Sequence, residues 1–346
     1  MKLKPGIILQ YIFFLALGLF LVWWSVKDID AQKWAEIKQS LEGARVYLVI
    51  PVFAILLISH YARALRWRLL MEPMGYNTGK LNTFFAVMVG YLANTAVPRL
   101  GEVLKCTILA RYEKVPADKL VGTIVQERLI DAFCFVIILL ITLAIQPDLY
   151  SRFIDTWFYS NSGEQAAAES SNTKYLIPLI GIVLVGLALG AWMLIKKKSF
   201  KDLFLMIKNL VLRVWQGLTT IRHMKKRKSF LLYTFLIWAG YLGSGYIGFL
   251  ALQETSHFGF KESLTVLSAG TIGMIVPTPG GIGAYAYFIE STMMVYGLPK
   301  SIATAFGWLL WLSQTAIILL AGCISVILLP VFNKKKSNNN SLVIEK

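Results

Sequence analysis

Six charged residues within one apolar stretch, together with a Pro–Gly break, constrain this chain more than any other feature. Between Val89 and Asp131 the hydrophobic sequence is interrupted by Arg99, Glu102, Lys105, Glu127, Arg128 and Asp131. Six unpaired charges facing lipid would cost on the order of 15–20 kcal/mol, comparable to the stability of a whole domain. We therefore expect these side chains to pair with one another, to line a wet cavity or to lie near an interface.

Apolar runs recur from end to end and predict an all-α polytopic membrane protein. The 346 residues are 56% hydrophobic and only 16% charged, against about 25% charged in soluble domains. A span needs about 20 residues, and six full spans are expected, at 7–26, 46–71, 120–146, 175–195, 230–252 and 301–329. The first run is interpreted as a retained helix, because no small-residue cleavage site follows it. The whole of 1–332 is then one transmembrane domain, with a polar tail at 333–346.

Two regions contain paired apolar segments that are too short to span separately. Segments 81–97 and 101–112 are joined by a break at Pro98 and Gly101, and segments 263–276 and 284–296 are joined by a second break. The second break contains Pro277, Gly280, Gly281 and Gly283. Such pairs predict two re-entrant helical hairpins.

The two broken regions resemble each other and predict an inverted repeat. VPRLG at 97–101 aligns with VPTPG at 276–280, which places Arg128 opposite Trp311 and Asp131 opposite Gln314. The halves would run from about 46 to 146 and from about 229 to 330. The identity is weak, so chance similarity is the alternative, since Pro and Gly recur at breaks in membrane helices.

Basic clusters beyond the apolar runs predict the topology. Segment 196–228 has eleven basic residues against one acidic residue and helical apolar spacing in its middle, so we expect it on the cytoplasmic membrane surface. Both termini are then cytoplasmic, 147–174 is an external loop, and the hairpins enter from opposite faces of a cell membrane, as inverted-repeat transporters require. Lipid phosphates and topology explain the net charge of +16 better than nucleic acid does.

The charged residues near the first break favour an anionic ligand. A helix that begins inside the membrane presents free N–H groups and a positive dipole end, and Arg99 and Lys105 are placed to meet a phosphate. Glu102 is expected to cap the half-helix, pair with Arg128 or titrate. Glu127 and Asp131 are one turn apart, and either Arg128 and Asp131 neutralise each other or a carboxylate acts as a gate or proton-coupling group.

Three further charged residues are candidates for the site. Arg63 and Arg66 share one helical face; they serve either as a positive-inside anchor or as a contact for anionic headgroups at the cytoplasmic face. Glu290, the single charge of segment 284–296, is expected to pair with a basic residue of the first hairpin or to face the external vestibule.

The motifs of common enzyme classes are missing from the sequence. There is no HExxH, CxxC, P-loop or GxSxG pattern, so we expect no cofactor, no metal site and no enzymatic activity. Transport would then be passive or driven by ions or by the membrane potential. The three cysteines, Cys106, Cys134 and Cys323, are interpreted as small hydrophobic residues.

Four ordered motifs are similar to a known family. They are ALRWRLL at 64–70, PRLGEVLK at 98–105, VP followed by QERLID within 115–131, and VPTPGGIGAYAYF at 276–288. Together they resemble the transmembrane, flippase-like region of lysylphosphatidylglycerol synthases, a family that also has stand-alone members. The resemblance extends over about 1–332. It implies site roles for Arg99, Gly101, Glu102, Arg128, Asp131, Pro277, Gly280, Gly281 and Gly283, while Lys105 stands where the family frequently has arginine.

The resemblance implies transfer of lipids between leaflets. Two-part members carry a soluble aminoacyl-transferase domain, for which we see no sequence after Lys336, so synthase activity is not expected. We predict a lipid translocator for an anionic or lipid-linked headgroup. The alternatives are an integral-membrane transferase or its accessory subunit, and a small-solute or ion-coupled transporter. The sequence does not determine which lipid is moved, in which direction or with what energy source. It also leaves open self-association and a partner enzyme of lipid synthesis.

Overall fold

The computed structural model describes residues 5–154, 205 and 224–344, and all its regular elements in these ranges are helices. The predicted all-α class is confirmed. The chain divides into two compact units, Met1–Thr142 with Met224–Lys346, and Leu143–His223. In the first unit the α-helices are α1 (Pro5–Val26), α2 (Ala31–Glu42), α3 (Val49–Met71), α4 (Lys80–Ala96), α5 (Leu100–Glu113), α6 (Ala117–Ile145, which continues into the second unit), α10 (Arg227–Ala251), α11 (Phe260–Ile275), α12 (Ala284–Val295) and α13 (Lys300–Ile344); short helical turns η1 (Val46–Leu48), η2 (Glu72–Met74) and η5 (Pro279–Gly281) lie between them. The second unit contains α7 (Leu149–Ile154).

Four described helices are long and apolar enough to cross a membrane. They are Val46–Met74, Ala117–Ile145, Arg227–Ala251 and Lys300–Lys334. Helices α1 and α2 make a fifth span if the pair, bent by 97°, counts as one. The predicted total of six is therefore not confirmed, because the expected span 175–195 and the expected surface segment 196–228 lie almost wholly outside the described residues.

Both predicted interruptions are present, and their backbone follows from proline and glycine. A proline disfavours helical dihedrals in the residue before it, and Val97 and Val276 are accordingly extended, with ψ of 117° and 122°. Around the second break, Gly280, Gly281 and Gly283 have φ of 57°, 72° and 72°, which glycine adopts without a Cβ clash. At the first break the left-handed position is filled by Arg99, with φ of 68°.

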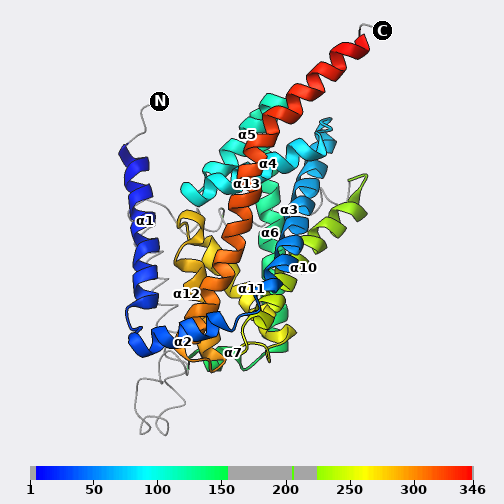
Figure 1. Ribbon diagram of the computed structural model, residues 1–346. Coiled ribbons are helices and arrows are strands. Elements are labelled where there is room, and N and C mark those ends of the chain that lie inside the picture. Colours follow the sequence, from blue (N-terminus) through cyan, green and yellow to red (C-terminus); the bar gives the residue numbers. More distant parts are fainter. Residues whose placement is uncertain (1–4, 155–204, 206–223, 345–346) are drawn as a thin grey trace. The chain divides into compact units, whose positions relative to one another are not determined.

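Small residues let the two arms of each hairpin approach closely. A Cβ on Gly101 of α5 would lie 1.8 Å from the Gly90 carbonyl oxygen of α4. In the other hairpin, a Cβ on Gly273 of α11 would lie 2.7 Å from the Tyr285 Cα of α12. The two breaks also meet, since a Cβ on Gly280 would lie 3.3 Å from the Thr95 Cα. In Figure 1 the cyan hairpin α4–α5 lies above the yellow-to-gold hairpin α11–α12.

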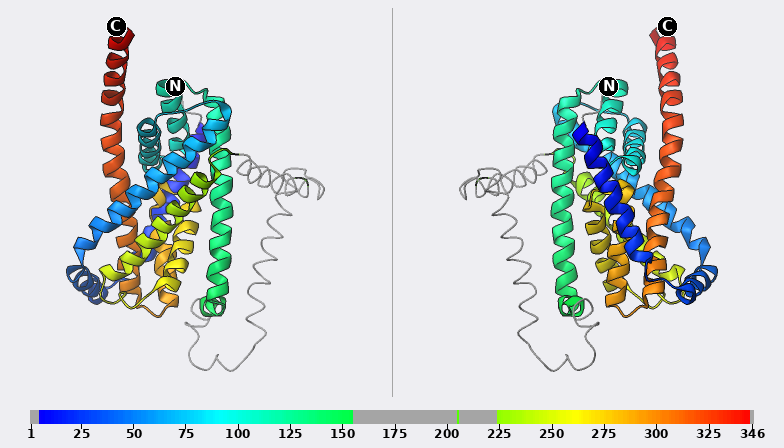
Figure 2. Two further views of the ribbon diagram at one scale, coloured as in Figure 1. Left: turned by 90° about the vertical axis from the view of Figure 1, so that its right-hand side faces the viewer. Right: turned by 90° about the vertical axis from the view of Figure 1, so that its left-hand side faces the viewer.

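Helices α3 and α10 run side by side between the hairpins (Figure 2). Ser59 Oγ donates to the Ile237 carbonyl oxygen at 3.1 Å, and a Cβ on Gly240 would lie 2.9 Å from Ser59 Cβ. Gly248 faces Leu310 of α13 in the same way. Close helix contact at small residues is how helices associate in lipid, so these two glycines of α10 serve helix packing.

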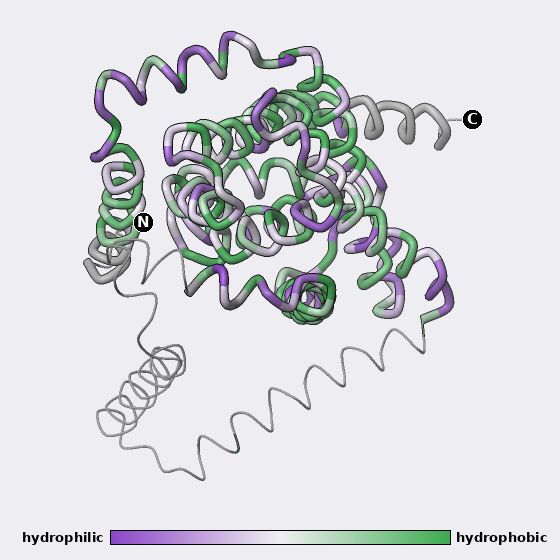
Figure 3. The backbone as a smooth tube through the Cα atoms, turned by 90° about the horizontal axis from the view of Figure 1, so that it is seen from below, coloured by the Kyte–Doolittle hydropathy of each residue, from purple (hydrophilic) through white to green (hydrophobic). Residues whose placement is uncertain are grey.

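An aromatic core joins α10, α12 and α13. Phe249 and Phe306 stack with ring centroids 5.1 Å apart, and Ile289 and Met293 of α12 pack into the same cluster. Viewed from below, the tube of the described helices is largely hydrophobic, whereas α2 shows alternating hydrophilic and hydrophobic turns (Figure 3). The described helices thus form a mostly apolar assembly around the hairpins.

Candidate functional site

Five charged side chains from three helices form a buried ion network. On α3, Arg63 Nη1 donates to Asp131 Oδ2 at 2.6 Å, and Arg66 Nη2 donates to Asp131 Oδ1 at 2.6 Å. Arg63 Nη1 also lies 3.3 Å from Glu127 Oε1. Lys105 Nζ of α5 donates to Glu127 Oε2 at 2.9 Å. We call this set of residues (Arg63, Arg66, Lys105, Glu127 and Asp131) the ion network.

Helical spacing explains why the network forms at this place. Arg63 and Arg66 are three residues apart on α3, and Glu127 and Asp131 are four apart on α6, so each pair shares one helical face. The side chains are at most 15% exposed. Three cations face two carboxylates, which leaves the network with a formal charge of +1.

The predicted Arg128–Asp131 pair is wrong. Asp131 bonds instead to the arginines of α3, while Arg128 Nη2 donates to Glu102 Oε1 at 2.9 Å. Successive residues of a helix are turned by about 100°, so Arg128 and Glu127 leave α6 in different directions and contact different residues of α5, Glu102 and Lys105. Pairing of Glu102 with Arg128 was one of the three alternatives for Glu102, and the structure shows it.

The structure places Arg63 and Arg66 inside the helical assembly rather than at an open cytoplasmic surface, and their contact with a headgroup stays a prediction. Their side chains are 9% and 0% exposed and belong to the ion network. Their acidic partners lie more than 60 residues later in the chain, which no local pattern reveals. Lys105, expected to meet a phosphate, likewise bonds to Glu127 and sits 4.5 Å from the centre of the Trp67 ring.

A cavity of about 390 Å³ borders the ion network. One part of its lining is polar or charged and consists of His60, Arg63, Tyr91, Arg128 and Asp131. Most of the remaining wall is apolar, with residues such as Leu56, Phe135, Val266, Met274 and Ile318. A further polar group stands in the wall where Gln314 Nε2 donates to the Tyr285 hydroxyl at 2.7 Å. The cavity is therefore amphipathic, with a net positive part and apolar sides.

Several buried donors at the charged part have no hydrogen-bond partner among the described residues. They are Arg63 Nε, Arg66 Nε and Arg66 Nη1, and His60 Nδ1 is likewise unpartnered. His60 and Arg63 both line the cavity and are 5% and 7% exposed. A buried polar group without a partner costs about 1–3 kcal/mol, so this part of the cavity favours a ligand that supplies acceptor oxygens.

Sequence reasoning missed the aromatic neighbours of the ion network. The His60 ring centroid is 5.1 Å from that of Tyr91 and 6.3 Å from that of Tyr241. Arg63 Nη2 donates to the Tyr241 hydroxyl at 3.4 Å. His60 lies three residues before Arg63 and hence on the same face of α3, a signal that was available in the sequence. Tyr91 and Tyr241 carry no such signal.

The break residues are not part of the cavity lining. Arg99 is exposed and has no ion-pair partner in the part of the chain that the structure describes. Gly280 supplies a carbonyl oxygen that accepts from Trp311 Nε1 at 3.0 Å. A Cβ on Gly281 would lie 2.6 Å from Met274 Sδ, and one on Gly283 would lie 2.4 Å from the Gly18 oxygen. Together with Pro277 in the same break, these glycines shape the hairpin and its contact with α1.

Both expectations for Glu290 are wrong. The Ser25 hydroxyl of α1 donates to its carboxylate, and Glu290 is only 3% exposed. It therefore neither pairs with the first hairpin nor faces a vestibule, because α1 covers α12 at this point. At the start of α13, Lys300 Nζ donates at 2.7 Å to Oδ2 of Asp28, in the turn between α1 and α2, and this hydrogen bond lowers the pKa of the Asp28 carboxyl.

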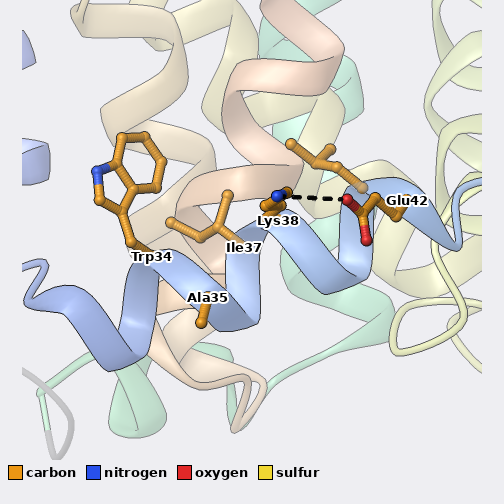
Figure 4. Close-up of a pocket in the computed structure, with 6 residues that line it drawn as sticks. Trp34, Ala35, Ile37, Lys38 and Glu42 are labelled. Atoms are coloured by element: carbon orange, nitrogen blue, oxygen red, sulfur yellow. Dashed lines mark ion pairs between the residues drawn. The ribbon is translucent and has the colours of Figure 1, made fainter.

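A second cavity, of about 620 Å³, runs along α2 and is lined by few polar side chains (Figure 4). Trp34 and Ile37 project from one side of α2 and Ala35 from the other. Its charged lining is the exposed pair Lys38–Glu42, 3.8 Å apart. In the described residues, no group of three or more His, Cys, Asp or Glu side chains is placed to hold a metal ion. The cavity beside the ion network is thus the stronger candidate site.

Comparisons with known proteins agree with a membrane function. The family model described as "Lysylphosphatidylglycerol synthase TM region" matches residues 11–322. A UPF0104 membrane protein of Methanothermobacter thermautotrophicus is 24% identical over 302 residues, which cover 78% of this chain and 82% of that protein. A UPF0104 membrane protein of Methanocaldococcus jannaschii is 27% identical over 92 residues, 26% of this chain and 27% of that protein. No solved structure matches the chain.

Proposed function

Because the chain belongs to the family of lysylphosphatidylglycerol synthase transmembrane regions, we propose that it translocates a lipid with an anionic or lipid-linked headgroup between the leaflets of the cell membrane. Its partners in this proposal are membrane lipids, both termini are cytoplasmic, and it carries out no covalent chemistry. The proposal leaves self-association and a partner enzyme of lipid synthesis open.

The amphipathic cavity is the observation that carries this proposal. An anionic headgroup would meet the net positive charge of the ion network and the one unpartnered donor of Arg63, Nε. Its hydrocarbon chains would lie against the apolar walls. Pockets for small ligands have volumes of about 300–1,000 Å³, so a cavity of about 390 Å³ suits a headgroup but not a whole lipid.

The ion network also explains how a headgroup would be sheltered at membrane depth. A polar group without partners in hydrocarbon costs several kcal/mol. Arg63, which lines the cavity, is held in place by Asp131 at 2.6 Å, so its unpartnered Nε is already oriented before a ligand arrives. A preorganised charged site of this kind reduces the free energy lost on ordering side chains.

Each half has a bridge between its hairpin and the long helix that follows, although the bridging residues are not the ones that the alignment of the halves pairs. In the first half, Arg128 of α6 bonds to Glu102 of α5; in the second, Gln314 of α13 bonds to Tyr285 of α12. Each bridge thus joins the second arm of a hairpin to the long helix that follows it. Inverted repeats of this architecture move against each other around a central site.

The same geometry weighs against the transferase alternative. A general base needs an available carboxylate. Asp131 accepts from two arginines, and Glu127 accepts from Lys105 and lies close to both arginines. Neither carboxylate is placed to take a proton from a substrate, so a binding role for the site is favoured over catalysis.

Lipid exchange in proteoliposomes tests the proposal. We expect the purified protein to accelerate leaflet exchange of a fluorescent phosphatidylglycerol above that of protein-free vesicles. Arg63→Gln should slow this exchange by about tenfold, equivalent to about 1.4 kcal/mol, whereas Arg45→Gln, at an exposed arginine outside the cavity, should not. Folded protein that exchanges no anionic lipid would contradict the proposal.

A further inference from the structure

The cavity beside the ion network reaches the outer surface between α6 and α11. Ala132 of α6 and Met274 and Ile275 of α11 line the cavity and are also exposed. Met274 is 49% and Ile275 is 66% exposed. Residues that face both the cavity and the outside mark an opening, so the cavity is accessible from the side of the helical assembly.

Few contacts close this opening. In the described ranges, one hydrogen bond joins the two helices, between Thr142 Oγ1 and Ser268 Oγ at 3.4 Å. At 1.5 Å per residue, Thr142 lies roughly 16 Å along α6 from Asp131. The helices are thus fastened together well away from the charged part of the cavity. Figure 2 shows α6 (green) as a helix at the edge of the first unit, beside the gold α11.

The rim of the opening is apolar. Its outer surface carries Phe133, Val136, Ile137 and Leu140 on α6 and Ile272 on α11, all of them exposed. A soluble ligand would gain nothing at such a rim, which in a bilayer faces lipid tails. Keeping a methylene group in an apolar environment rather than in water is worth about 0.8 kcal/mol, so a hydrocarbon chain is the occupant that this surface fits.

We propose that a hydrocarbon chain of the transported lipid lies in this opening while its headgroup occupies the charged part of the cavity. We call the opening the α6–α11 portal and define it by Ala132, Phe135, Leu267, Met274 and Ile275. The inference rests on the proposed function, since it names the route by which the tails remain in the bilayer as the headgroup moves.

Photolabelling tests the portal without depending on transport. The probe is a phosphatidylglycerol with a photoreactive diazirine in one acyl chain, in vesicles that contain the full-length protein. Mass spectrometry is expected to find labels on α6 and α11 near Ala132 and Met274. Ala132→Trp should fill the portal and reduce this labelling by at least about fivefold, as expected for a bulky side chain in a confined space.

Val121→Trp is the matched control, because Val121 is 56% exposed on the same helix, lies eleven residues before Ala132 and lines neither the cavity nor the rim described above. It should leave both labelling and exchange unchanged. Thermal unfolding of both variants confirms that each is folded. An equal loss of labelling in the two variants would contradict a specific portal.

The outcomes separate the portal from the proposed function. If Ala132→Trp abolishes labelling but the wild-type protein exchanges no lipid, the portal is a lipid site and translocation is contradicted. If Ala132→Trp leaves lipid exchange unchanged and no label is found on α6 or α11, the portal is contradicted while translocation is still supported. Loss of both labelling and exchange in Ala132→Trp alone is the result we expect.

Discussion

At the scale of single residues, Glu127 holds the ion network together. It is 2% exposed and lies within 4 Å of three cations, Lys105, Arg63 and Arg66. Removing one partner of a buried ion pair typically costs about 3–5 kcal/mol, because the remaining charges stay buried without compensation. We expect Glu127→Gln to lower the free energy of unfolding by that amount, measured by denaturation in detergent micelles.

Glu102→Gln serves as the control for this substitution. Glu102 and Arg128 form a partly exposed pair, with side chains 32% and 50% exposed, and such pairs contribute about 0–1 kcal/mol. A loss of stability as large in Glu102→Gln as in Glu127→Gln would show that burial of the ion network is not what makes Glu127 important.

A second residue-scale prediction concerns which arginine is coupled to Asp131. The structure joins Asp131 to Arg66 at 2.6 Å and directs Arg128 to Glu102. In double-mutant cycles on unfolding free energy, Arg66→Met and Asp131→Asn should therefore show a coupling energy of about 1–3 kcal/mol. Arg128→Met and Asp131→Asn should couple by less than about 0.5 kcal/mol. The reverse order would restore the local Arg128–Asp131 pair that the sequence suggested.

The charged residues of the site were predictable from the sequence, but their partners were not. The cost of a charge in lipid was sufficient to require that Glu127, Arg128 and Asp131 be paired. The local pattern suggested pairing along one helix. Asp131 instead accepts hydrogen bonds from Arg66 and Arg63, which precede it by 65 and 68 residues. Contacts of that separation depend on how α3 and α6 face each other, which hydrophobic periodicity does not determine.

At the scale of elements, the first hairpin depends on a glycine at its arm-to-arm contact. A Cβ on Gly101 would lie 1.8 Å from the Gly90 carbonyl oxygen, so neither arm can accept a methyl group there. Gly101→Ala should force the arms apart and destabilise the protein by several kcal/mol, in the range of strong overpacking. Thermal unfolding and the yield of monodisperse protein measure the effect.

Gly122→Ala on α6 provides the matched control. A Cβ at Gly122 meets nothing within 4 Å, and alanine is a better helix former than glycine by about 1 kcal/mol. The control should therefore be neutral or slightly stabilising. If Gly101→Ala behaves like Gly122→Ala, the close contact of α4 and α5 is contradicted.

The positions of the breaks followed from the sequence because proline and glycine act locally. A proline removes a helical hydrogen bond and clashes with the preceding turn, and both interruptions occur where Pro98 and Pro277 led us to expect them. The contact of α1 with the second hairpin was not predictable in the same way. It depends on Gly18 lying against Ile282, and nothing in either segment alone indicates the other.

The junction of α6 and α11 gives a further prediction at this scale. Thr142 and Ser268 have hydroxyl oxygens 3.4 Å apart, so cysteine side chains at these two positions would bring their Sγ atoms close to each other. With Cys106, Cys134 and Cys323 replaced by alanine, Thr142→Cys combined with Ser268→Cys should form a disulfide on oxidation. If the portal must widen during transport, oxidation should slow lipid exchange by about tenfold, and reduction should restore it.

The two single-cysteine variants are the controls for the disulfide. They receive the same oxidant and should keep their exchange rate. If the fully cross-linked double variant keeps its rate of lipid exchange, α6 and α11 do not separate at Thr142 and Ser268. Any movement of the two helices would then occur at the portal.

At the scale of the whole molecule, the arrangement of the hairpins predicts how the chain lies across a membrane. Lys114 follows α5 at the open end of the first hairpin, and His257 precedes α11 at the open end of the second; both residues are exposed. The breaks of the two hairpins meet at Thr95 and Gly280. Hairpins that meet at their breaks have open ends pointing in opposite directions, so Lys114 and His257 should lie on opposite sides of the membrane.

Site-directed labelling with a membrane-impermeant maleimide tests this arrangement in intact cells and in inverted vesicles of a cysteine-free background. Lys114→Cys and Lys334→Cys, in the basic cluster after the last span, should react from the same side, which the excess of basic residues predicts to be the cytoplasm. His257→Cys should react only from the other side. The test compares the side from which Lys114→Cys reacts with the side from which His257→Cys reacts, so it is valid even if the positive-inside rule fails for this chain. Reaction of Lys114→Cys and His257→Cys from the same side would contradict the inverted repeat, and with it the route by which a headgroup would pass from one hairpin to the other.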